Sequence, residues 1–177
     1  MERKAPSIPP PREIVLVVHD IRSTHNVGSL LRTAECLGVT MVFFSGYTPY
    51  PDTPEDSRLP HIRRKLAAQI EKTALGAEKL VSWRYEADVQ AVLKSLRADG
   101  YELIGLEQDS RSQPLPSWSP PPKAAILLGR EVEGIDPALL AQCDTVVEIP
   151  QFGSKESLNV VQAAAIALYQ ARFVPYT

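Results

Sequence analysis

The 177-residue chain has only two cysteines, Cys36 and Cys143, and three histidines. Two isolated cysteines cannot form a disulfide framework, and none of these residues has metal-site spacing, so we expect no bound metal. No apolar run approaches the ~18 residues that a membrane span needs. The N-terminal residues lead into prolines rather than into the apolar stretch of a signal peptide. We therefore expect a cytoplasmic protein in a reducing compartment, with no membrane association.

An excess of charge of one sign is also missing, since 19 basic residues face 21 acidic ones and the net charge is −2. This balance excludes a globally basic nucleic-acid coat. Residues 58–84 are the local exception, with seven basic and two acidic side chains. Such a stretch can steer a polyanion to one face of the protein, although a solvated helix surface produces the same pattern. The candidate polyanion-binding residues are Arg58, Arg63, Arg64, Lys65 and Lys72.

The pattern of apolar residues predicts the fold. Prolines mark residues 1–13 as an extended arm, and residues 14–177 read as a single domain. We predict strands at 14–18, 40–44, 80–83, 101–106, 124–128 and 145–149, and helices at 26–37, 62–73, 86–98, 137–141 and 157–173. Strands that are apolar throughout and alternate with helices indicate an α/β fold, with helices on both faces of a mostly parallel sheet. Ligands in such sheets bind beyond the carboxyl ends of the strands.

The first unusual segment, residues 19–32, follows a predicted buried strand and opens a helix. Asn26 is suited by type to cap that helix, and Gly28 lets another backbone approach closely. Arg32 lies one turn further on, where its forked donors suit a phosphate. An ordinary capped helix with a surface arginine explains the same residues.

Two more segments follow predicted strands. Residues 127–135 place Gly129 directly after a strand, with Glu131 and then Gly134 in the next turn; neither a dinucleotide fingerprint nor a Walker loop is present. Residues 149–166 contain Ser157, which we predict to cap the last helix, and Asn159, whose amide can contact a substrate. A glycine-bordered turn and a buried, alanine-rich helix are the structural alternatives.

Together the three segments resemble the SpoU (TrmH-like) family of the SPOUT superfamily, which are RNA ribose 2'-O-methyltransferases. The likeness spans residues 14–173 and rests on Asn26-Val27-Gly28 with Arg32, on Leu128-Gly129-Arg130-Glu131 with Gly134, and on Ser157-Leu158-Asn159-Val160. The resemblance implies a deep C-terminal trefoil knot and a homodimer formed through the knot region. It also implies S-adenosylmethionine as cofactor and S-adenosylhomocysteine as product. The implied cofactor-binding residues are Leu106, Gly129, Ile149 and Leu158.

The resemblance further implies a catalytic set of Asn26, Arg32, Glu131, Ser157 and Asn159, acting on tRNA or rRNA. A ribose 2'-hydroxyl is a poor nucleophile, so its proton must be removed or its developing charge stabilised. We expect Arg32 to hold the neighbouring phosphate and the 2'-oxygen, because a guanidinium essentially never deprotonates in a protein. Glu131 is expected to hold Arg32 or the nucleotide. The basic residues of 58–84 and the N-terminal arm would then capture RNA.

Some features depart from the family's pattern or leave other functions open. Gln151 stands where the family usually has methionine, and Arg130 stands where a small polar residue is frequent. Three alternatives remain: a non-catalytic RNA-binding relative, a base methyltransferase of the superfamily, and an unrelated α/β enzyme with a nucleotide cofactor. The presence of Arg32, Glu131, Ser157 and Asn159 argues against the first, and the missing glycine fingerprints argue against the last.

Overall fold

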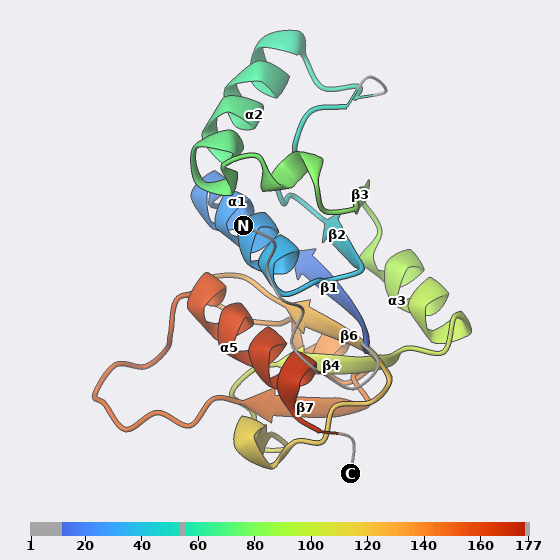
Figure 1. Ribbon diagram of the computed structural model, residues 1–177, viewed down its shortest axis with the longest axis vertical. Coiled ribbons are helices and arrows are strands. Elements are labelled where there is room, and N and C mark those ends of the chain that lie inside the picture. Colours follow the sequence, from blue (N-terminus) through green and yellow to red (C-terminus); the bar gives the residue numbers. More distant parts are fainter. Residues whose placement is uncertain (1–11, 54–55, 176–177) are drawn as a thin grey trace, which may run out of the picture.

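The computed structural model describes residues 12–53 and 56–175, so most of the predicted arm at 1–13 lies outside the described residues. The described part contains one sheet, in which every strand pair is parallel and the order is β3-β2-β1-β6-β4-β7-β5 (Figure 1). The strands are β1 (Glu13–His19), β2 (Met41–Ser45), β3 (Trp83–Glu86), β4 (Glu102–Leu106), β5 (Gln113–Pro114), β6 (Lys123–Leu128) and β7 (Thr145–Glu148). The parallel α/β sheet is confirmed.

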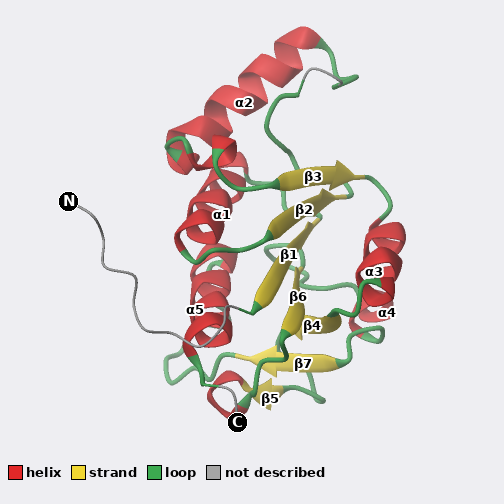
Figure 2. Ribbon diagram, turned by 45° about the vertical axis from the view of Figure 1, so that its right-hand side comes forward, coloured by secondary structure: helices red, strands yellow, loops and turns green. Residues whose placement is uncertain are grey.

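Helices cover both faces of this sheet, as predicted (Figure 2). They are α1 (Thr24–Cys36), α2 (Pro60–Ala74), α3 (Val89–Ala98), α4 (Pro137–Leu140) and α5 (Val160–Phe173). Helices α1 and α5 lie on one face and α3 and α4 on the other. Alternate residues of β1 therefore enter two separate cores, Leu16 and Val18 on the α1 side and Val15 and Val17 on the α3 side. Burial on both faces explains why the strand is apolar throughout.

The helix predicted from residue 86 begins at Val89, because β3 occupies residues 83–86 rather than the predicted 80–83 and Asp88 caps α3. Two other predicted helix starts, at residues 26 and 157, are wrong at the site itself. Ser23, rather than Asn26, caps α1, because its hydroxyl accepts the Asn26 N–H at 3.2 Å. Asn159, rather than Ser157, caps α5 and accepts the Val161 N–H at 2.9 Å. Residues 149–159 consequently form a long loop, visible as the orange segment that extends from the body in Figure 1. Neither Asn26 nor Ser157 therefore caps a helix.

Gly28 is the point at which α1 and α2 cross. A Cβ atom at this position would overlap the Ile70 carbonyl oxygen and the Thr73 hydroxyl oxygen of α2. The Thr73 hydroxyl also donates to the His25 carbonyl at 3.0 Å, which fixes the same contact from the other helix. The close backbone approach predicted for Gly28 is therefore confirmed, and the approaching group is α2 rather than a ligand.

We predict that Gly28→Ala lowers the free energy of unfolding by about 2 kcal/mol, because the added methyl forces the two helices apart. Urea unfolding measures this change. Gly153→Ala is the matched control, since a Cβ there meets no heavy atom within 4 Å and should leave stability unchanged. Equal stability of the Gly28 and Gly153 variants would contradict the close contact between α1 and α2 at Gly28.

Arg12 joins the start of β1 to the end of α5. Its guanidinium is buried and donates to the carbonyl oxygens of Pro120 at 3.0 Å, Ala171 at 3.1 Å and Val174 at 2.6 Å. A charged donor that satisfies three carbonyls is worth more than a neutral hydrogen bond, because the acceptors are otherwise left unpaired. The two ends of the described chain are fastened together at this point.

Arg12→Ala is accordingly expected to cost about 3 kcal/mol of stability. Thermal unfolding followed by circular dichroism measures the loss. Arg84→Ala on β3 serves as the control, because Arg84 is exposed and its side chain makes no hydrogen bond or ion pair within residues 12–53 and 56–175. A melting temperature of the Arg12 variant equal to that of the Arg84 variant would rule out the fastening role.

Candidate active site

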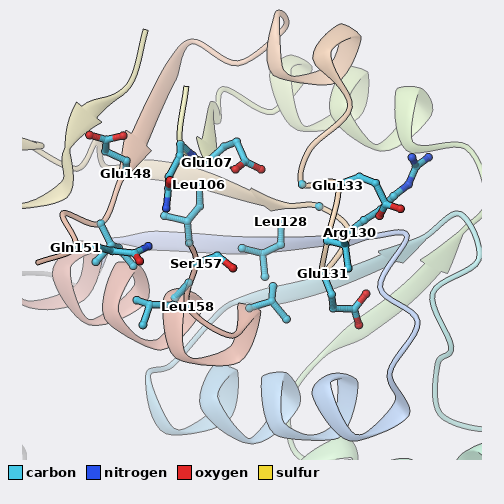
Figure 3. Close-up of a pocket in the computed structure, with 17 residues that line it drawn as sticks. Leu106, Glu107, Leu128, Arg130, Glu131, Glu133, Glu148, Gln151, Ser157 and Leu158 are labelled. Atoms are coloured by element: carbon cyan, nitrogen blue, oxygen red, sulfur yellow. Dashed lines mark hydrogen bonds between the residues drawn. The ribbon is translucent and has the colours of Figure 1, made fainter. Parts of the chain in front are cut away.

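A pocket lies beyond the carboxyl ends of β4, β6 and β7, next to the start of α5 (Figure 3). The location is the one expected for a ligand in a parallel sheet. All four positions predicted to bind the cofactor line it, namely Leu106, Gly129, Ile149 and Leu158. Leu128 and Val160 add apolar surface, and Gln151 reaches the same space. The pocket is thus assembled from the ends of three strands and the loop before α5.

The turn after β6 explains the two glycines of this segment. The Arg130 N–H donates to the Gly134 carbonyl at 3.0 Å, and the Gly134 N–H donates back to the Arg130 carbonyl at 3.1 Å. Gly134 has a φ of 73°, the left-handed region that favours glycine. A Cβ on Gly129 would overlap the backbone of Gly134 and Ile135. The turn's own backbone, rather than a ligand alone, therefore requires glycine at position 129.

The lining of the pocket is acidic. Four glutamates contribute to it, Glu107, Glu131, Glu133 and Glu148, against a single basic side chain, Arg130, among the described lining residues. Glu107 was not predicted from the sequence; it follows β4 directly and accepts the Ile135 N–H at 2.8 Å and the Gln108 N–H at 3.0 Å. A charged residue immediately after a buried strand was the signal that would have found it. The charge distribution suits a ligand with positive charge.

Three of the predicted catalytic residues form one hydrogen-bonded chain beside the pocket. The Asn26 amide nitrogen donates to the Glu131 carboxylate at 3.2 Å. The Asn159 amide nitrogen in turn donates to the Asn26 oxygen at 3.4 Å. Asn26 therefore links two residues that are distant from it in sequence, and Ser157 lines the adjoining pocket. We call Glu131, Asn26 and Asn159 the amide chain.

Backbone N–H groups at the N-terminus of α1 hold Glu131 in its charged form. Its carboxylate accepts the N–H groups of Ser23 at 3.1 Å and Arg22 at 3.2 Å, in addition to the Asn26 amide. Burial by itself raises the pKa of Glu131, but the backbone donors of Ser23 and Arg22 and the Asn26 amide together outweigh it, so the pKa lies below its ordinary value. The group is therefore an anionic acceptor at neutral pH.

Arg32 stands apart from the amide chain. It lies on α1, is exposed, and does not line the pocket. The expected contact between Glu131 and Arg32 is not formed, because the partners of Glu131 are Ser23, Arg22 and Asn26. No side-chain hydrogen bond or ion pair of Arg32 occurs within the described parts of the chain. Its guanidinium is thus available to a group that the protein itself does not supply.

The predicted polyanion-binding residues fall into two groups. Arg58 pairs with Asp56 and lies over the Tyr50 ring, 3.6 Å from its centroid. Arg63 pairs with Asp52 at 2.6 Å. These two arginines therefore pair with carboxylates of the segment before α2. The remaining members, Arg64, Lys65 and Lys72, are exposed on α2, whose N-terminal half extends past the sheet in Figure 1.

Within the described residues, no three His, Cys, Asp or Glu side chains are grouped so that they would hold a metal ion. The helices of the same residues include none with the length and apolarity required to cross a bilayer.

The parallel sheet, the pocket at its carboxyl edge and the polar chain beside that pocket define an α/β domain with a ligand site at the strand ends. The model of the SpoU rRNA Methylase family matches residues 13–169. The chain therefore belongs to the SpoU rRNA Methylase family.

Individual relatives agree with this membership. The 23S rRNA (guanosine-2'-O-)-methyltransferase RlmB of Neisseria meningitidis is 31% identical over 159 residues, which is 90% of this chain and 58% of that protein. The tRNA (guanosine(18)-2'-O)-methyltransferase of Saccharomyces cerevisiae is 30% identical over 89% of this chain and 10% of its own length. The chain thus spans little more than half of RlmB. The AdoMet-bound rRNA methyltransferase from Sinorhizobium meliloti has the same fold, with a TM-score of 0.76 at 21% identity, over 96% of this chain and 60% of that one.

Proposed function

We propose that the protein transfers a methyl group from S-adenosylmethionine to a ribose 2'-hydroxyl of tRNA or rRNA. The amide chain carries the proposal, because it places an anionic acceptor and two amides beside a pocket lined by the four predicted cofactor-binding residues. The names of the relatives support it, since they describe ribose methylation of both rRNA and tRNA.

The residues of the pocket fit the proposed cofactor. S-adenosylmethionine combines a flat aromatic adenine with a cationic sulfonium and amine, and it supplies the electrophilic methyl group when bound. Leu106, Leu128 and Leu158 offer the apolar surface, and Glu107 and Glu133 the complementary negative charge. The bound cofactor in the Sinorhizobium meliloti relative supports the same assignment.

The amide chain would orient the reacting ribose. Glu131 holds the Asn26 amide at one end, and the Asn159 amide holds it at the other, so neither amide turns freely. Hydrogen bonds fixed before the substrate arrives need no reorganisation during the reaction. Ser157 faces the same space and would contact the ribose or the cofactor. Arg32, with no internal partner among the described residues, would hold the neighbouring phosphate and stabilise the charge that develops on the 2'-oxygen.

RNA capture by α2 is a further part of the proposal. Arg64, Lys65 and Lys72 are exposed and would contact phosphates. Arg58 and Arg63 would act indirectly, by ordering the loop before the helix. The reaction would take place in the cytoplasm, where the RNA substrate is found.

The proposed catalytic domain comprises residues 14–177, with the trefoil knot and the homodimer of the family. The exposed side chains Ile166, Tyr169 and Phe173 on α5 support the dimer, because they form an apolar face that a second copy would cover. The rings of Tyr169 and Phe173 already pack on each other, with centroids 4.6 Å apart.

Transfer of labelled methyl from S-adenosylmethionine to unmodified tRNA and rRNA tests the function. We expect label in one class of RNA. Cofactor binding without transfer to either RNA, even with cell extract added as a source of partners, would favour the non-catalytic relative. Absence of cofactor binding would reject the enzyme altogether.

A further inference from the structure

A second polar cluster lies at the carboxyl ends of β1, β2 and β6. It shares Arg130 with the pocket lining, and the proposed reaction does not use it. Asp20, directly after β1, is buried and has a left-handed φ of 57°. One of its carboxylate oxygens accepts the Tyr47 N–H at 3.1 Å, and the other accepts a terminal nitrogen of Arg130 at 3.2 Å. A strained conformation that persists in a buried residue is held by its surroundings and is typical of functional sites. Asp20 thereby fixes both Tyr47 and Arg130.

Tyr47 and Arg22 are fixed through their backbones, while their side chains reach solvent. The Tyr47 N–H is bound to Asp20, and the Arg22 N–H is bound to Glu131 of the amide chain. The Tyr47 side chain is 48% exposed, and Arg22 is also exposed. The Arg22 guanidinium lies over the Tyr47 ring, with its carbon 5.7 Å from the ring centroid. The backbones of Arg22 and Tyr47 are therefore bound to the active-site residues, while their side chains are exposed to solvent.

The Arg130 side chain is the third member of the cluster. Its Nη2 donates to Asp20, and the other N–H groups of its guanidinium have no partner within the described residues. In Figure 3 its guanidinium extends past Glu133, on the side away from Leu106 and Gln151. Glu133 adds negative charge near both Arg22 and Arg130 but forms no ion pair with either in the described structure. Arg130 therefore presents donors outward, rather than toward the predicted cofactor-binding residues.

Two arginines and an exposed aromatic ring, linked through Asp20 and Glu131, match the chemistry of single-stranded RNA. Unpaired bases stack on aromatic rings and guanidinium planes, and arginine forks bind the flanking phosphates. The cluster also adjoins the proposed target ribose, since Arg22 and Ser23 both donate to Glu131. We propose that Arg22, Tyr47 and Arg130, here the β1–β2 shelf, bind the nucleotide next to the methylated one. The Tyr47 ring would stack on its base, and the two arginines would hold its phosphates. This inference rests on the proposed function.

Equilibrium binding at several salt concentrations tests the shelf, with pooled unmodified tRNA transcripts and, separately, unmodified rRNA, in the presence of S-adenosylhomocysteine. Tyr47→Ala is expected to weaken binding about tenfold without changing the slope of log K against log salt, because stacking releases no counterions. Tyr47→Phe should bind as the wild type does. Arg22→Ala is expected to reduce the magnitude of that slope by about 0.7, the share of one phosphate contact with a single strand.

The control is Lys94→Ala, which removes an exposed positive charge from α3 on the opposite face of the sheet and should leave both quantities unchanged. Wild-type binding and slope in both the Tyr47→Ala and Arg22→Ala proteins would overturn the inference. Equal losses in Tyr47→Ala and Tyr47→Phe would also overturn it, because the hydroxyl rather than the ring would then be responsible. A wild-type protein that transfers no methyl group would refute the proposed function, while the binding measurement would still decide the shelf.

Discussion

Replacing Asn26 with alanine is expected to lower kcat for methyl transfer about 100-fold. The substitution removes the amide that joins Glu131 to Asn159, so the ribose loses its orienting groups at the moment when charge develops. Affinity for S-adenosylmethionine should not change, because Asn26 does not line the pocket. Single-turnover transfer at saturating cofactor and RNA measures kcat, and calorimetric titration measures cofactor affinity.

Thr24→Ala is the matched control for Asn26→Ala. Thr24 lies in the same first turn of α1, but its hydroxyl donates to the Gln69 side chain at 3.3 Å and takes no part in the amide chain. We expect the Thr24 variant to retain wild-type kcat. If both variants lose activity equally, the effect comes from disturbance of the helix end, and the role of the amide chain is wrong.

Replacing Arg32 with alanine is expected to lower kcat/KM for RNA by about 100-fold while leaving the protein as stable as the wild type. Both expectations follow from its position, because Arg32 is exposed and has no side-chain hydrogen bond or ion pair within the described residues. Its loss therefore removes contacts with the substrate and not contacts within the fold. Steady-state transfer kinetics measure the fall in kcat/KM, and urea unfolding of the same preparation measures the stability.

Arg32→Lys separates charge from geometry. Lysine keeps the positive charge but loses the planar fork, so we expect partial recovery of KM and little recovery of kcat. Full activity in Arg32→Ala would refute the assignment. A marked fall in the free energy of unfolding of Arg32→Ala, alongside the loss of activity, would assign Arg32 to the fold instead.

The fold was predictable because burial leaves a clear pattern in the sequence. Strands that lie between two helical layers are apolar on both faces, and β1 shows this in the assignment of Leu16 and Val17 to different cores. The two-residue strand β5 was missed, since Gln113–Pro114 carries no pattern that a strand of this length could show. The start of α1 was misplaced, because Ser23 and Asn26 are equally good caps by residue type.

The site was only partly predictable for a different reason. The family resemblance named Asn26, Glu131 and Asn159 as one set, and the structure joins them by hydrogen bonds. Contacts between distant segments are otherwise not visible in the sequence. Arg63 and Lys65 are both basic residues of the same predicted helix, yet Asp52, eleven residues before Arg63, pairs with it and Lys65 is left exposed. Asp20 lies within the unusual segment 19–32, but its importance emerges only from its burial and its backbone conformation.

The position of the transferred methyl group tests the central claim most directly. RNA labelled by the wild-type protein should be hydrolysed with alkali, because a methylated 2'-oxygen cannot attack the adjacent phosphodiester. The proposed reaction predicts that the label remains in alkali-resistant dinucleotides, whose mass shows the methyl group on the ribose. Label released entirely in mononucleotides would place the methyl group on a base and would contradict ribose methylation at the amide chain.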